Sequence, residues 1–242
     1  MQVALFITCL SDVFYPSVGM SVVRVLRRLG VEVDFPTEQT CCGQPAFNSG
    51  YRQDAAKAAK QMIRAFEGYD AVITPSGSCA AMVRKEYPHL LNDDSEWKER
   101  AQSLADRCYE FSEFLVSRLS LEMIDARLEG KATYHHSCHM YRGLRLTEPP
   151  LQVLSQVQGL EVVNLPYHED CCGFGGTFAV KMSEISQEMA DEKIQHLEST
   201  EADYLIGSDM SCLMHLGGRI RRKEKSVEIM HVAQVLDRGM MK

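Results

Sequence analysis

Cysteine is the residue type whose spacing indicates chemistry most directly in this chain of 242 residues. Adjacent cysteine pairs followed by glycine occur twice, at Cys41-Cys42-Gly43 and Cys171-Cys172-Gly173. One single cysteine precedes each pair and another follows it, with 31 to 39 residues in between. The chain therefore contains two copies of the pattern C…CC…C, and we expect its members to bind metal. These cysteines are Cys9, Cys41, Cys42, Cys79, Cys138, Cys171, Cys172 and Cys212.

Thiolate sulfur is a soft ligand, so four cysteines that converge on one point suit a soft metal centre. An iron–sulfur cluster accepts two adjacent thiolates at different iron atoms, although the usual ferredoxin spacings are absent. A tetrahedral zinc ion needs only four cysteines, but zinc ligands usually stand two to four residues apart. Thiol–disulfide chemistry without a metal is the third alternative. The adjacent pairs favour the cluster among these three.

Glycines follow both cysteine pairs. Without a side chain, a glycine lets its backbone N–H approach a sulfur atom closely. The glycines that we predict to contact the bound cofactor are Gly43, Gly173, Gly175 and Gly176. These residues do not form a dinucleotide-binding fingerprint, because GxGxxG is absent, and the chain has no Walker loop.

Histidines surround the single cysteine that opens the second copy. His136 and His139 flank Cys138, and we predict that they lie at the cofactor as ligands or proton donors. Core packing, or a hydrogen bond to a metal ligand, is the alternative for both. The same alternatives apply to His135 and His168.

The composition is that of a globular protein, with 45% hydrophobic and 24% charged residues. A net charge of −7 gives a nucleic-acid partner no electrostatic support. No apolar run is long enough for a membrane span, and no signal peptide is visible, so we expect a cytoplasmic protein. Cytoplasmic thiols stay reduced, and the odd count of nine cysteines also argues against a disulfide framework. The ninth, Cys108, is predicted to be a core residue.

The sequence around the cysteines repeats as well, at an offset of about 130 residues. Gly30-Val31-Glu32-Val33 leads to the first pair and Gly159-Leu160-Glu161-Val162 to the second. A duplication of this size indicates two domains, not a solenoid of short repeats. We place the domains at residues 1–124 and 125–242, with Asp125–Lys131 as a polar linker.

The elements that must position the cysteines are short apolar strands that alternate with amphipathic helices. The predicted strands are Val3–Thr8, Val31–Phe35, Ala71–Thr74, Tyr109–Phe111, Ala132–His136, Leu160–Leu165, Tyr204–Ile206 and Val227–Met230. The longer predicted helices are Pro16–Leu29, Asp54–Phe66, Glu96–Arg107 and Val180–Glu198. The last of these helices is expected to bury Met182, Ile185, Met189, Ile194 and Leu197.

This alternation predicts an α/β fold of two tandem, internally duplicated Rossmann-like domains with parallel sheets. In a parallel sheet, the loops that follow the strands lie at the same edge, the carboxyl end, where open α/β folds bind ligands. A cysteine follows each of the first three strands of either half. We therefore expect cysteines far apart in sequence to converge at that edge.

At these motifs the sequence resembles a known family. The doubled pattern is similar to the cysteine-rich (CCG) domain found in the B component of heterodisulfide reductase, which also occurs in the iron–sulfur subunits of glycolate oxidase and anaerobic glycerol-3-phosphate dehydrogenase. The similarity is closer to the lactate utilization A family of bacteria, and it covers the whole chain. The segments that carry it are Leu5–Asp12, Thr40–Ala46, Thr74–Cys79 and Asp170–Lys181.

The resemblance implies a redox role. Lactate utilization proteins A, B and C are thought to act together in oxidising L-lactate to pyruvate. It implies an electron-transfer subunit with 4Fe-4S clusters, whose partners are the other lactate utilization subunits, among them a ferredoxin-type iron–sulfur protein. The chain has no flavin, nicotinamide or ferredoxin motif, so we expect no lactate oxidation without those partners. A zinc-stabilised scaffold subunit of the same complex and a metal-free thiol reductase are the alternatives.

The sequence departs from the family at one position in each half. In the B component of heterodisulfide reductase, each domain holds a non-cubane 4Fe-4S cluster through five cysteines, the last two spaced CxxC. Here Ser76 stands three residues before Cys79, and Asp209 three residues before Cys212. Each site thus has four thiols, which leaves open an ordinary cluster, a zinc ion, or oxygen ligation by Asp209.

Overall fold

The computed structural model describes residues 1–240, and over that range the chain forms two parallel sheets of equivalent strand order. The first sheet has the order β2 (Val33–Asp34), β1 (Val3–Leu5), β3 (Ala71–Thr74) and β4 (Cys108–Glu110). The second sheet has the order β6 (Val157–Val163), β5 (Ala126–His135), β7 (Tyr204–Gly207) and β8 (Glu228–His231). All these pairs are parallel, which confirms the predicted duplicated α/β fold.

Helices connect the strands in both halves. Those of the first half are α1 (Cys9–Phe14), α2 (Pro16–Arg28), α3 (Gln44–Asn48), α4 (Arg52–Ala65), α5 (Gly77–Ala81), the π-helical η1 (Met82–Glu86), α6 (Tyr87–Leu90), α7 (Ser95–Asp106), α8 (Phe111–Arg118) and the 3-10 turn η2 (Leu121–Met123). Those of the second half are the π-helical η3 (His139–Leu144), α9 (Glu148–Leu154), α10 (Thr177–Lys181), α11 (Ser183–Glu198), α12 (Met210–Arg222) and α13 (Val232–Met240). None of the helices in residues 1–240 combines the length and the apolar character that crossing a membrane requires.

Helix α2 illustrates how the sequence sets these elements. Pro16 occupies its first position, where a backbone N–H has no partner within the helix and its absence costs nothing. Apolar residues recur on one face, where Val22, Val25 and Leu26 join the main hydrophobic cluster and Val18 joins a cluster of the second half. The buried members of that face are Val18, Val22, Val25 and Leu26.

The cysteines lie at the carboxyl ends of the strands, as the pattern predicts. Each adjacent pair lies in the loop that follows β2 or β6, the edge strand of its sheet. The single cysteines stand in or directly before the first turn of a helix that follows β1, β3, β5 or β7: Cys9 in α1, Cys79 in α5, Cys138 before η3 and Cys212 in α12.

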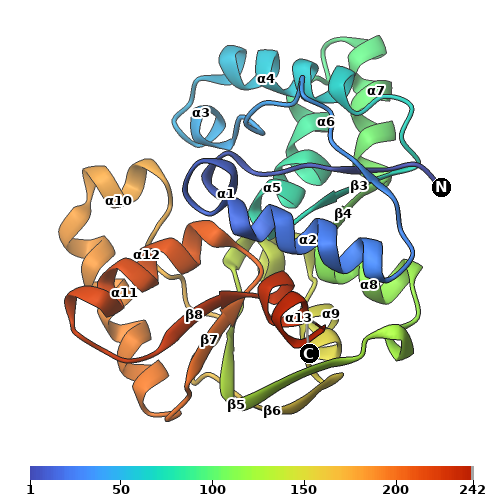
Figure 1. Ribbon diagram of the computed structural model, residues 1–242. Coiled ribbons are helices and arrows are strands. Elements are labelled where there is room, and N and C mark those ends of the chain that lie inside the picture. The colour runs from blue at the N-terminus through green and yellow to red at the C-terminus, as the bar shows by residue number, and fades with distance from the viewer. Residues whose placement is uncertain (241–242) are drawn as a thin grey trace.

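The two halves share a core, and Figure 1 shows the first half packed above the second. The last helix of each half crosses to the other half, so that α13 packs on α2 and α8 packs on α9. The main hydrophobic cluster contains residues of both sheets, among them Val3 and Ile73 of the first and Ala132 and Ile206 of the second. The domain boundary after residue 124 stays a prediction.

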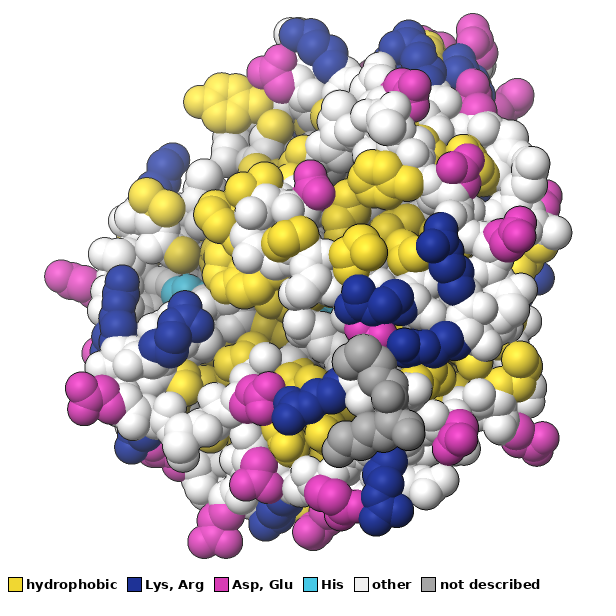
Figure 2. All heavy atoms as spheres, in the orientation of Figure 1, with side chains coloured by type: hydrophobic (Ala, Val, Ile, Leu, Met, Phe, Trp, Pro, Cys, Tyr) yellow, Lys and Arg dark blue, Asp and Glu magenta, His cyan; other side chains and the backbone are white. Residues whose placement is uncertain are grey.

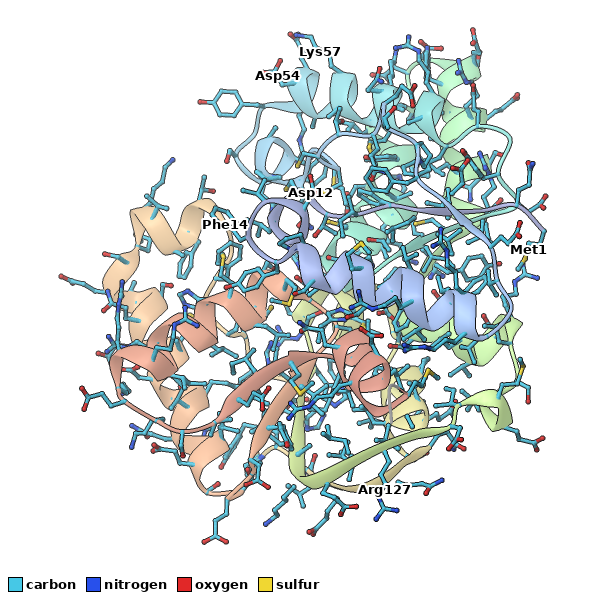
Figure 3. All side chains as sticks on the ribbon, in the orientation of Figure 1. Met1, Asp12, Phe14, Asp54, Lys57 and Arg127 are labelled. Atoms are coloured by element: carbon cyan, nitrogen blue, oxygen red, sulfur yellow. The ribbon has the colours of Figure 1, made fainter. Side chains whose placement is uncertain are left out.

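The interpretation of Asp125–Lys131 as a linker was wrong. Ala126–His135 is a single strand, β5, with an irregularity in its pairing with β6 between Arg127 and Gly130. Arg127 lies on this strand at its exposed end (Figure 3) and pairs with Glu129 at 2.8 Å. Arg127 and Glu129 are exposed at the start of this interior strand and alternate with buried residues, so the segment resembles a linker in sequence.

The predicted helix Val180–Glu198 is two helices, α10 and α11, and its buried face differs from the predicted one. Met182 and Ile185 are 49% and 52% exposed, whereas Ile194 and Leu197 are buried as expected. The remaining buried positions of α11 are Ser186, Ala190 and Lys193. Polar residues took core positions here because they hold the second cysteine loop by hydrogen bonds, as described below.

Candidate metal centre

The repeated cysteines of both halves line one cavity of about 230 Å³. We call Cys9, Cys41, Cys42 and Cys79 the first quartet, and Cys138, Cys171, Cys172 and Cys212 the second quartet. Residues from both halves complete the wall, among them Gln44, Asn48, Ser76, Phe174 and Asp209. The fold therefore brings together all eight cysteines that the sequence singled out, and it turns both quartets towards a common space.

The first quartet is compact. The Sγ atoms of Cys9 and Cys41 lie 3.6 Å apart, and those of Cys42 and Cys79 lie 3.5 Å apart. Cys9 is exposed, whereas Cys42 and Cys79 are 3% and 8% exposed, so the quartet extends from the surface into the core. Tyr87, fully buried, donates its hydroxyl hydrogen to the carbonyl oxygen of Cys42 at 2.8 Å and fixes this loop.

The second quartet has a similar pattern of burial, except that Cys138 is half-buried where Cys9 is exposed, and a different set of neighbours. Cys172 and Cys212 are buried, and their Sγ atoms lie within 4.8 Å of each other and of a ring nitrogen of His135. The backbone N–H of Gly173 points to Cys171 Sγ at 3.4 Å. Cys138 Sγ lies 3.6 Å from His139 Nδ1.

One cysteine in each quartet has a lowered pKa, which favours its thiolate form. Hydrogen bonds from Cys42 and Cys9 lower the pKa of Cys41. Hydrogen bonds from Cys138 and Cys172 lower the pKa of Cys171 in the same way. The same contacts, together with burial, raise the pKa of Cys9, Cys42, Cys138 and Cys172. A bound cation would favour the thiolate form of its ligands and displace their protons.

The predicted glycines divide into two groups. Gly175 and Gly176 line the cavity. Gly43 and Gly173 instead shape the turn after each pair, with φ of 84° and 87°, a region that side chains disfavour. A Cβ at Gly173 would also lie 2.5 Å from the carbonyl oxygen of Ser186, so the loop packs on α11 only with glycine here.

The predicted histidines divide as well. His139 is exposed and lies beside Cys138. His136 does not reach the cavity: its ring packs 4.8 Å from Tyr134 and 4.9 Å from His168 between ring centroids. Its role in cofactor binding therefore stays a prediction that the geometry does not favour. His135, which the sequence left ambiguous, brings a ring nitrogen within 4.8 Å of the Sγ atoms of Cys172 and Cys212.

Ser76 of the first half and Asp209 of the second half are hydrogen-bonded to each other and do not take the place of the cysteines in either quartet. Asp209 Oδ2 accepts hydrogen bonds from Ser76 Oγ at 3.1 Å and from the backbone N–H of Ser78 at 2.8 Å. Its Oδ1 accepts from the N–H of Ser211 at 3.1 Å. Because these bonds engage both carboxylate oxygens, oxygen ligation by Asp209 is disfavoured.

The donor set fits a thiolate-bound metal group. Sulfur atoms from distant loops lie at 3.5 to 3.6 Å in the first quartet, and the nine cysteines of the described residues 1–240 form no disulfide. Cys108 stands apart from both quartets, 2% exposed in the core of the first half, where burial raises its pKa to about 12. The quartets are thus arranged to bind a metal ion or a metal cluster.

The model of the cysteine-rich domain family, CCG, matches the chain twice, over residues 3–84 and 132–217. The chain belongs to the CCG cysteine-rich domain family. Each match contains one complete quartet, so the family's repeat unit coincides with the repeat of the sites.

Full-length relatives exist within this family. Lactate utilization protein A 2 of Bacillus cereus strain Q1 is 59% identical over 242 residues, which is all of both chains. Lactate utilization protein A of Geobacillus thermodenitrificans strain NG80-2 is 58% identical over 237 residues, covering 98% of this chain and 99% of the relative.

A solved structure of a hypothetical protein from Helicobacter pylori shares the fold. It matches with a TM-score of 0.67 at 11% identity, and the match covers all of this chain and 49% of that one. The present chain thus spans about half the length of that protein, and the likeness shows the fold alone.

Proposed function

We propose that this protein is an iron–sulfur electron-transfer subunit of a bacterial complex that oxidises L-lactate to pyruvate, with one centre, expected as a 4Fe-4S cluster, in each half. The observation that carries the proposal is the single cavity lined by both quartets. The names of the full-length relatives supply the lactate context. The cytoplasm is the compartment that we propose.

The cysteines are the groups through which the chain would act. A bound iron–sulfur cluster supplies one-electron transfer. Each quartet would hold its cluster between an exposed side, at Cys9 in the first half, and a buried side, at Cys42 and Cys79. Because both quartets border the same cavity, electrons can pass between the halves without crossing the core of either sheet.

Exposed apolar side chains next to the cavity support a partner subunit. Helix α1, which carries Cys9, exposes Val13 and Phe14 at 69% and 63%, and Phe14 is labelled in Figure 3. Figure 2 shows apolar side chains gathered over α1. On the other side, α10 begins at the cavity and exposes Val180 at 81%. We propose the ferredoxin-type subunit as the partner that covers this face.

Iron and acid-labile sulfide analysis of anaerobically purified protein tests the proposal. We expect both elements, broad absorbance near ~400 nm from thiolate-bound iron, and bleaching by lactate when the partner subunits are added. The Cys108→Ser variant is the matched control, because it removes a buried thiol outside the quartets. Protein that binds only zinc under these conditions, or clusters that lactate never reduces through the partners, would contradict the proposal.

A zinc-stabilised scaffold subunit is the second candidate. The spacing of 3.5 to 3.6 Å between sulfur atoms is close to the ~3.8 Å edge of a tetrahedral zinc–thiolate site. A structural zinc site stabilises the fold without redox activity. Under this candidate, chelation unfolds the protein and lactate changes no spectrum. A metal-free thiol reductase instead predicts reversible oxidation of the adjacent thiols in metal-free protein.

A further inference from the structure

We propose that His135 is a ligand of the centre in the second half, which therefore binds its metal through cysteine sulfur and imidazole nitrogen together. The inference rests on the proposed function only in that the second quartet holds a metal. It goes beyond that function by making the two centres chemically different.

The environment of His135 is the first argument. The side chain stands at the end of β5 and is 2% exposed. Neither Nδ1 nor Nε2 has a hydrogen-bond partner among the described residues 1–240. Buried polar atoms are almost always paired in folded proteins, so an imidazole with two unpaired nitrogens requires a partner that protein atoms do not supply.

The position of the ring is the second argument. One ring nitrogen of His135 and the Sγ atoms of Cys172 and Cys212 all lie within 4.8 Å of one another. That spread fits ligands of one ion or of neighbouring irons in a cluster. Asp209 cannot take this place, because its oxygens accept hydrogen bonds from Ser76, Ser78 and Ser211.

The duplication supplies an internal comparison. His135 stands three residues before Cys138, and the residue three before Cys9 is Phe6. Phe6 is 1% exposed and packs against Phe66 at 5.7 Å between ring centroids. The same site in the fold therefore carries an apolar ring in one half and an unpaired imidazole in the other, so core packing alone does not require a histidine here.

Pulsed electron paramagnetic resonance on reduced protein with nitrogen-labelled histidine tests the proposal. We expect one of the two centres to show the strong hyperfine coupling of a bound histidine nitrogen. His135→Phe, which installs the residue of the first half, should abolish that coupling while the other centre keeps its spectrum. His136→Phe is the matched control, an adjacent buried ring outside the cavity, and should leave the coupling unchanged.

Cobalt titration of metal-free protein separates this inference from the proposed function. Thiolate-bound cobalt has intense visible absorbance, and replacing a sulfur donor by nitrogen shifts its bands. We expect two kinds of cobalt site in the wild type and a changed second site in His135→Phe, whichever metal the native protein carries. If the native protein contains no iron but His135→Phe still changes the cobalt spectrum, the proposed iron–sulfur function would be contradicted and the ligand role of His135 would be retained. If His135→Phe changes neither the nitrogen hyperfine coupling nor the cobalt spectrum, the inference is overturned. An unchanged first centre in that variant shows that the variant folds.

Discussion

The two quartets carry the same cysteines in different surroundings. Residues that are apolar around the first quartet are polar around the second, at positions that the duplication makes equivalent. The pairs, first half before second, are Phe6 and His135, Ala55 and Ser186, Met62 and Lys193, and Met82 and His215. Every one of the first-half residues is buried, so the difference lies in the protein interior and not on a solvated face.

The polar residues of the second half act on the cysteine loop. Lys193, 3% exposed, donates hydrogen bonds from Nζ to the carbonyl oxygens of Tyr167, His168 and Asp170 at 2.7 to 3.1 Å. Ser186 Oγ donates to the carbonyl oxygen of Gly173 at 2.8 Å. In the first half, the equivalent of Lys193 is a methionine.

The difference indicates that the two halves keep the same cysteines in different environments. Net charge and hydrogen bonds around sulfur set the reduction potential of an iron–sulfur centre. A buried cation and polar donors stabilise the more negative, reduced form. We therefore expect the second centre to accept electrons at a higher potential than the first, which would give electron flow a direction within one chain.

Serine substitution in each quartet has the largest expected effect. Cys42→Ser and Cys172→Ser should each remove one centre, with loss of about half of the iron and sulfide, because each removes a buried ligand. If the surroundings matter, the spectra and potentials of the two surviving centres will differ. If the surviving centres of Cys42→Ser and Cys172→Ser have identical spectra, the two quartets do not differ in their effect on the bound centre. Cys108→Ser serves as the control and should retain both centres.

Two equivalent buried groups, Glu110 and His231, should contribute to the stability of the chain with opposite pH dependence. They end β4 and β8 at matching positions of the two sheets, paired with Thr74 and Gly207. Burial raises the pKa of Glu110 to about 8. Burial lowers the pKa of His231 to about 4, and His231 Nε2 donates a hydrogen bond to the carbonyl oxygen of Pro75 at 3.2 Å.

The signs follow from linkage. Glu110 stays protonated in the folded chain, so its contribution falls as pH rises from the unfolded pKa near ~4.3 to about 8. His231 stays neutral, so its contribution falls as pH drops from ~6.5 to about 4. Glu110→Gln has no carboxyl group to titrate at this position. As pH rises from 4 to 9, the unfolding free energy of this variant should therefore increase by about 2–4 kcal/mol relative to that of the wild type. His231→Gln should lessen the acid loss by about 1–3 kcal/mol. Denaturant unfolding across pH measures both, and parallel pH profiles for the two variants would contradict the assignment.

The ion cluster around Asp237 should stabilise the contact between the halves. Its carboxylate, 4% exposed, accepts from Ser21, Arg24 and Arg28 of α2, whereas the equivalent position on α8 is Val116. Asp237→Asn should cost about 2 kcal/mol, because it leaves two partly exposed arginines unpaired. Thermal unfolding measures this cost.

A surface ion pair is the control for that variant. Asp54→Asn breaks the exposed pair with Lys57 (Figure 3) and should change Tm very little. Burial opposes ionisation of Asp237, but its partners outweigh burial and lower its pKa. The stabilisation should therefore persist above pH ~4 and disappear on further acidification, and equal effects of the two variants would count against a coupled interface.

Lys193→Met, which installs the first-half residue, has the smallest expected effect. Removal of one buried cation near Cys171 should lower the potential of the second centre by tens of millivolts and leave the first unchanged. Redox titration followed by electron paramagnetic resonance measures this shift. Lys181→Met removes the same charge from exposed α10 and is the control. If the potential of the second centre shifts by a similar amount in Lys193→Met and Lys181→Met, the effect comes from the net charge of the protein and not from the buried position of Lys193.

The cysteine repeat allowed much of the fold and the site to be predicted. Two copies of C…CC…C fixed the duplication, and the strands before each cysteine fixed the edge at which the sulfur atoms meet. The second part of strand β5 was predicted, but its beginning was missed because Arg127, Glu129 and Lys131 resemble a linker when the buried residues between them are overlooked. Pairing with β6 and β7 decides that segment, and no local pattern reports such distant partners.

The histidine at the site was predictable in principle. Of two adjacent histidines at a strand end, alternation sends one to each face, but it does not say which of them meets the buried cysteines. Aligning the halves places His135 on Phe6, a buried apolar residue, and this indicates a buried position for His135. The buried lysine of α11 was not predictable, since Lys193 reads as a solvated residue until the carbonyl groups of the cysteine loop are in place.

The shared apolar cluster beneath the two sheets has a consequence for how this chain can be divided. If the polypeptide were cut after residue 124, each fragment would expose apolar core side chains to solvent and would carry only part of the cavity wall. Neither fragment should persist alone, and only reassociation of the two would rebuild the sites. Because one hydrophobic cluster spans both halves, we expect the chain to unfold as a single cooperative unit, and the loss of either centre should lower the melting temperature of the whole chain.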